Sequence, residues 1–264
     1  MGLNEALARI TDPYERQARL WPALLALLPL IAMVGLVYAA EASAITNAVT
    51  LAASCGALYL LTGLCREFGR RLEPKLFEAW GGKPSTQLLR HRDPTIEGVT
   101  KRRYHAFLAT KINTPFPDEA QEAQDPKAAD EIYQSAVRWL LNHTRDTKTF
   151  GLLLQENIAY GFRRNALGLK PVGLLIAAGC ATWVMIQHGV ITLSSDRFFS
   201  ISALLEMPMT AALSLTVSAL MLLVWIGYFT KTSARTFAFA YAEMLLRACD
   251  VICQENNPQQ NRVA

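Results

Sequence analysis

Residues 22–40 read PALLALLPLIAMVGLVYAA, a run of 19 residues that contains no Asp, Glu, Lys, Arg or His. As an α-helix this run would be about 28 Å long, close to the roughly 30 Å of a bilayer's hydrocarbon core. Three further runs without any Asp, Glu, Lys or Arg occupy residues 45–64, 171–193 and 209–229. The sequence therefore predicts an all-α integral membrane protein with four transmembrane helices.

The first run could also be the core of a cleaved secretion signal, because such signals are short apolar stretches near an N-terminus. Its 19 residues exceed a usual signal core, and the second run begins within five residues of its end. We therefore favour a transmembrane hairpin over residues 1–65, introduced by a short helix at the membrane interface.

The basic residues are distributed very unevenly around the four runs. Of the 26 Lys and Arg residues, 3 precede the first run, 18 lie in residues 66–170, 4 follow the last run, and only Arg197 lies between the third and fourth. The positive-inside rule then places both termini and the middle segment in the cytoplasm, with the protein in the cell inner membrane. This organisation predicts a cytoplasmic helical domain at 66–170, a second hairpin at 171–229, and a cytoplasmic helix and tail at 230–264.

Local patterns predict the elements outside the membrane. Apolar residues spaced by three and four indicate helices, and clusters of Gly and Pro indicate loops. The predicted helices cover residues 66–73, 101–111, 128–141, 150–165 and 231–255, and the predicted loops cover residues 80–94 and 114–126.

Small residues recur at every fourth position of the second run, at Ala44, Ala48, Ala52 and Gly56. Such a stripe lets another helix approach closely in lipid. Two partners fit it equally well, namely the first span of the same chain or a helix of another subunit.

No pattern in the chain predicts catalysis. His91-Arg92-Asp93 matches a kinase triplet, but the other kinase motifs are missing, as are phosphate-loop, dinucleotide and zinc-peptidase signatures. Cys249 and Cys253 lie one helical turn apart without the further ligands that a zinc site needs. We therefore expect a protein that is not an enzyme, with no cofactor and no metal.

Basic and aromatic residues gather in the middle segment, where Arg can bind phosphate and aromatic rings can stack on a base. The candidate ligand-binding residues are Trp80, Lys83, Arg90, His91, Arg92, Arg102, Arg103, Tyr104, His105 and Arg145. A simpler interpretation pairs Arg90 and Arg145 with acids of the same domain. For arginines near the span ends, such as Arg66 and Arg163, contact with anionic lipid is favoured.

Several segments together resemble a group of bacterial four-span membrane effectors of antiviral defence, including the Hailong type and related effectors of nucleotide-signalling systems. The matching segments are residues 80–82, 89–93, 103–105, 144–147, 156–158 and 160–165. The resemblance implies a homo-oligomer such as a tetramer, which senses a nucleotide or a single-stranded oligonucleotide such as DNA. A partner nucleotidyltransferase would make this ligand, and activation would permeabilise the inner membrane.

Two functions of different classes follow. The first is a ligand-gated ion channel or pore, whose path lies on the axis of an oligomer because four uncharged spans are too few to enclose one. The second is a non-conducting membrane scaffold that recruits a cytoplasmic partner. A proton-coupled carrier is disfavoured, since the spans lack the ionisable residues that such carriers use.

Overall fold

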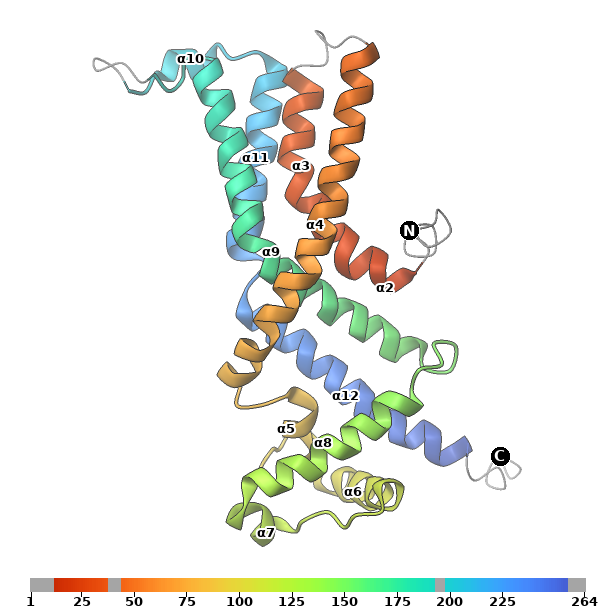
Figure 1. The fold of residues 1–264 in the computed structure, drawn as a ribbon. Coiled ribbons are helices and arrows are strands. Elements are labelled where there is room, and N and C mark those ends of the chain that lie inside the picture. The colour runs from red at the N-terminus through yellow and green to blue at the C-terminus, as the bar shows by residue number, and fades with distance from the viewer. Residues whose placement is uncertain (1–11, 38–43, 193–197, 256–264) are drawn as a thin grey trace, which may run out of the picture. The chain divides into compact units, whose positions relative to one another are not determined.

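The computed structural model describes residues 12–37, 44–192 and 198–255, and in the second range it describes side chains at residue 53 and from residue 55 onward. Within these residues the regular structure is helical, and one isolated antiparallel bridge joins Ile191 and Phe199. The helices, shown in Figure 1, are α2 (Pro13–Glu15), η1 (Arg16–Leu20), α3 (Trp21–Val37), α4 (Ala44–Ala79), α5 (Pro84–Leu89), α6 (Gly98–Ile112), α7 (Glu119–Gln124), α8 (Pro126–His143), α9 (Gly151–Gln187), α10 (Ile201–Leu205), α11 (Met209–Gly227) and α12 (Lys231–Glu255).

Three helical segments of the described residues are long and apolar enough to cross a membrane, namely Pro13–Val37, Gly151–Gln187 and Met209–Gly227. They cover most of the predicted first, third and fourth spans, as expected of a multi-pass membrane protein. The predicted second span, 45–64, lies within α4, but many of its side chains are outside the described residues. The fourth crossing therefore stays a prediction.

Of the small-residue stripe, only Gly56 has a described environment, and no atom lies within 4 Å of the Cβ that a side chain would add there.

The chain divides into two compact units. The first, which we call the membrane unit, comprises Met1–Glu73 and Gly161–Ala234, and the second, the polar unit, comprises Pro74–Tyr160 and Arg235–Ala264. The predicted boundaries at 66 and 170 followed the ends of apolar runs. The boundaries in the structure instead fall inside the helices α4, α9 and α12.

Close helix crossings hold the membrane unit together. α3 and α11 pack along each other, and Trp225 of α11 is fully buried. A Cβ added to Gly173 of α9 would lie 2.3 Å from the Trp225 ring, so only glycine leaves room for the indole. At a second crossing, a Cβ on Gly168 would lie 2.7 Å from the backbone nitrogen of Gly69 in α4. Small residues of this kind allow close backbone approach between helices in lipid.

The polar unit has its own core, to which α5, α6, α8, α9 and α12 contribute. α8 is strongly amphipathic and buries Tyr133 and Leu140 completely. The core of the polar unit removes these apolar side chains from water. Such burial is the main driving force for helix packing in water.

Three local predictions were wrong in detail. The predicted loop at 80–94 contains α5, which begins at Pro84, a favoured first residue of a helix. The predicted loop at 114–126 contains α7, and a capping box between Asp118 and Gln121 stabilises the start of this helix. The predicted helix at 150–165 does not end before Pro171, because α9 continues through this proline to Gln187.

Candidate functional site

The candidate residues of the polar unit are organised around the loop that follows α5. Lys101 of α6 is 5 % exposed, and its ammonium donates to the backbone carbonyls of Arg90, at 2.7 Å, and of Asp93. Burial lowers the pKa of Lys101, an effect that the neighbouring Asp93 and Glu122 oppose. This buried amine therefore fixes residues 90–93 against the first turn of α6.

Arg90 is held by groups of its own unit. Its Nε and Nη2 donate to the two carboxylate oxygens of Asp130 in α8, at 2.8 and 2.6 Å, and its Nη1 donates to the carbonyl of Gly81 at 3.0 Å. The hydrogen bond to Asp130 is the main reason why the pKa of Arg90 is raised. A two-pronged pair of this kind uses the guanidinium fully. Arg90 thus forms the internal pair that the sequence left open as an alternative to ligand binding.

His91 and His105 belong to a hydrogen-bonded network inside the unit. The carboxylate of Glu122, which is 5 % exposed, accepts from the backbone N–H of His91 at 2.8 Å and from the Tyr133 hydroxyl at 2.7 Å. The His91 ring donates to the carbonyl of Pro117 at 2.9 Å, and the His105 ring donates to that of Leu89 at 2.8 Å. Burial lowers the pKa of His105 to about 4, so this imidazole is neutral at pH 7. Both rings therefore hold the fold together.

Arg103 and Tyr104 meet Asp250 of α12. The Tyr104 hydroxyl donates to one carboxylate oxygen at 2.8 Å, and Arg103 donates to the other at 2.7 Å. Tyr104 is buried, and burial raises the pKa of its phenol. The Arg103 side chain is 60 % exposed despite this ion pair, so it can still meet a ligand.

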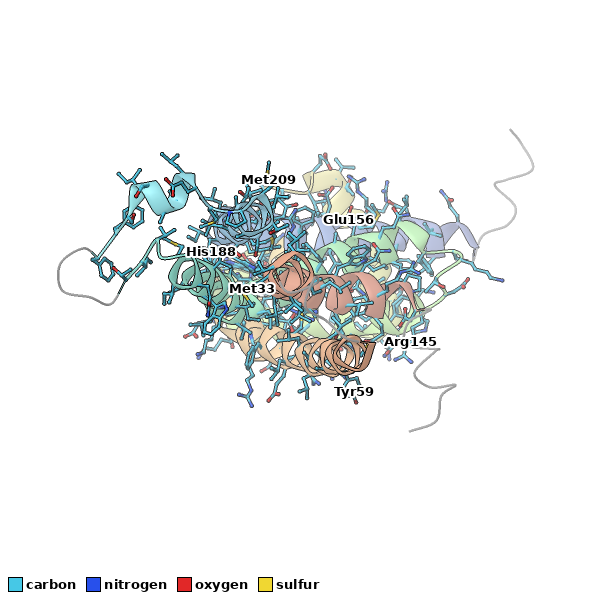
Figure 2. The ribbon with its side chains drawn as sticks, turned by 90° about the horizontal axis from the view of Figure 1, so that it is seen from above. Met33, Tyr59, Arg145, Glu156, His188 and Met209 are labelled. Atoms are coloured by element: carbon cyan, nitrogen blue, oxygen red, sulfur yellow. The ribbon has the colours of Figure 1, made fainter. Side chains whose placement is uncertain are left out.

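The remaining candidates differ in what they contact. Lys83 donates to Gln134 of α8 at 3.1 Å, Arg145 donates to Asn142 at 2.9 Å, and Trp80 packs against Phe77 with ring centroids 6.0 Å apart. Figure 2 shows Arg145 at the edge of the side chains. Among the described residues, no hydrogen bond, ion pair or ring contact joins Arg145 or Trp80 to another candidate residue.

Arg92 and Arg102 are exposed, and neither forms an ion pair or a side-chain hydrogen bond with the described residues. Arg92 lies in the loop that Lys101 holds, and Arg102 directly follows Lys101 in α6. Lys101 therefore ties the loop that carries Arg92 to the helical turn that carries Arg102, next to the exposed Arg103. An anion at this surface would meet guanidinium donors, which suit phosphate oxygens.

The acidic partners are the residues that sequence reasoning missed. Asp130, Glu122 and Asp250 accept the hydrogen bonds that fix the candidate residues, yet each is separated in sequence from its partner. One signal was available, since Asp130 and Tyr133 share the apolar side of a predicted helix at spacing three.

Among residues 12–37, 44–192 and 198–255, no group of three or more His, Cys, Asp or Glu residues could hold a metal ion. Comparisons with protein-family models, with curated proteins and with solved structures give no match. The resemblance to defence effectors, and the nucleotide ligand that it implies, therefore stay predictions.

Proposed function

We propose that this protein is an oligomeric membrane effector of antiviral defence, gated by a nucleotide or a single-stranded oligonucleotide at the polar unit. The observation that supports this site most is that Arg92 and Arg102 are exposed and form no ion pair with described residues, next to the loop that Lys101 holds. Guanidiniums without a carboxylate partner are available to phosphate oxygens. Arg103 would add a third contact at the same surface.

The effector part of the proposal rests on the membrane unit. α3 and α11 contain no ionisable side chain, so neither supplies a polar path through the membrane. An ion path on the axis of an oligomer could instead be lined by small and hydroxyl-bearing residues contributed by several copies. Ligand binding by the polar unit would then shift the population between closed and open assemblies.

The test of the ligand site uses the full-length protein in detergent. Arg92→Glu with Arg102→Glu should abolish binding of short single-stranded oligonucleotides and of cyclic nucleotides, as measured by isothermal titration calorimetry. Where the wild type binds, the logarithm of its affinity should fall with the logarithm of salt concentration, at roughly 0.7 per phosphate contact with a single strand.

The matched control is Lys127→Glu with Lys148→Glu, which makes the same charge change at two exposed positions of the same unit. It should keep most of the wild-type affinity. Binding by the Arg92 and Arg102 variant at wild-type strength would refute the site. Binding without ion flux, measured in proteoliposomes containing a potential-sensitive dye, would instead support the non-conducting scaffold.

A further inference from the structure

A groove of about 680 Å³ lies in the membrane unit between η1 and α4. Its wall along α4 is uncharged from Cys55 to Leu64 and becomes charged at Arg66 and Glu67. The lining residues include Arg16, Arg19, Leu58, Gly63, Leu64 and Arg66. The groove thus has an apolar length and a charged mouth.

The apolar length suits a hydrocarbon chain. Helical rise places Cys55 and Arg66 roughly 16 Å apart along α4, a length comparable to much of an acyl chain. Leu60 and Tyr59 on this stretch are each 65 % exposed, and Figure 2 shows Tyr59 at the outer edge of α4. Large exposed apolar side chains next to a groove are typical of a surface that another apolar molecule covers.

The mouth has an excess of positive charge once its ion pairs are considered. Glu15 pairs with Arg19, and Glu67 pairs with Arg71, so both carboxylates are already neutralised. Arg16 and Arg66 form no ion pair with the residues that the structure describes, and both are exposed. These are donors for an anionic group.

Buried contacts fix the η1 side of this mouth in place. Asn165 of α9 is fully buried, and its amide donates to the carbonyl of Ala18 at 2.8 Å. A Cβ on Gly161 would lie 2.9 Å from the Tyr14 hydroxyl and 3.1 Å from Ala18, so α9 and η1 pack closely. η1 is a five-residue π-helix, a rare form that is found frequently at functional sites. Arg16 and Arg19 therefore project from a rigid element.

We propose that this groove binds one anionic phospholipid, with its phosphodiester at Arg16 and Arg66 and an acyl chain along Leu58 to Leu64. The apolar wall favours a lipid over free phosphate, which would leave that wall uncovered. The unpaired guanidiniums favour a headgroup without an ammonium, because a choline or ethanolamine group would place a cation beside them. This inference does not rest on the proposed nucleotide ligand.

The test compares phosphatidylglycerol with phosphatidylcholine on the full-length protein. Native mass spectrometry after exchange from mixed micelles should show one retained phosphatidylglycerol, favoured about tenfold or more over phosphatidylcholine. Arg16→Gln with Arg66→Gln should remove this preference. The matched control, Arg70→Gln with Lys75→Gln, changes charge by the same amount at exposed positions of α4 that do not line the groove, and should keep it.

A second variant tests the apolar part without changing charge. No atom lies within 4 Å of a Cβ added at Gly63, so Gly63→Trp should fill the groove, leave the fold intact and abolish lipid retention. Equal lipid preference in the wild type and the Arg16 and Arg66 variant would overturn the proposal, and so would displacement of the lipid by inorganic phosphate alone. Efficient cross-linking of two copies through Cys55, in a Cys253→Ser background with lipid present, would show that a second copy occupies the groove instead.

Discussion

Replacing Glu122 by alanine tests the network inside the polar unit. The Glu122 carboxylate is almost fully buried and accepts from the His91 N–H at 2.8 Å and the Tyr133 hydroxyl at 2.7 Å. Hydrogen bonds to a charged group contribute about 1.5–3 kcal/mol each. The substitution also leaves two buried donors without an acceptor. We therefore expect Glu122→Ala to lower the free energy of unfolding of the polar unit by roughly 3–5 kcal/mol.

Hydrogen exchange measured by mass spectrometry can assign this loss to the polar unit of the intact protein. Amides of α6 and α8 that exchange only when the unit opens should exchange between about a hundredfold and a few thousandfold faster, since 1.4 kcal/mol corresponds to a factor of ten. Amides of α3 and α11, in the membrane unit, should exchange as in the wild type.

Two further variants sharpen the result. Glu122→Gln keeps the shape and one acceptor oxygen but removes the charge, so it should lose only about 1–2 kcal/mol. Glu119→Ala lies one turn earlier on the exposed side of α7 and should change stability by a few tenths of a kcal/mol. Equal exchange rates in Glu122→Ala and Glu119→Ala would refute the reasoning.

Two other predictions concern packing and pH. Gly173→Ala should destabilise the membrane unit by about 1–3 kcal/mol, because the added methyl group would overlap the Trp225 ring. Gly179→Ala on the same helix places its methyl group in open space and should not destabilise the unit. Equal melting temperatures of the two variants in detergent would contradict this. Because burial lowers the pKa of His105 to about 4 from 6.5, the unfolded state binds more protons between these values. Polar-unit stability should therefore fall by about 3 kcal/mol as pH drops from 7 to 4, and His105→Gln should flatten that part of the melting profile.

Three of the four apolar runs correspond to helices that could cross a membrane, since a run without charges that is long enough for a bilayer permits few other structures. The error at Pro171 has a simple physical origin. Proline removes one backbone donor, which favours a helix start in isolated sequence, but a helix packed on both sides can continue through it. In the structure, α9 extends from Gly151 to Gln187 with Pro171 inside it. The sequence shows the local penalty but not the packing that offsets it.

The missed helix α7 has the opposite explanation. Asp118 and Gln121 spell a capping box, and both reciprocal hydrogen bonds are present in the structure. The signal is therefore in the sequence, although the acidic and proline-containing composition of the segment favours a loop. Glu122, which α7 places at the buried network, was missed for the same reason.

The candidate site shows where sequence reasoning ends. Arg90 and Arg92 are two residues apart in one basic cluster, and nothing in their local sequence separates them. In the structure, Arg90 donates two hydrogen bonds to the carboxylate of Asp130, 40 residues away, whereas Arg92 remains exposed. A carboxylate brought close by tertiary folding neutralises one arginine and leaves the next available, so a basic cluster locates a surface without identifying its ligand contacts. The same reasoning separates Arg16 and Arg66 from Arg19 at the lipid groove, because Arg19 forms an ion pair with Glu15. Pairing and exposure, rather than charge density, therefore determine which arginines the two proposed binding sites can use.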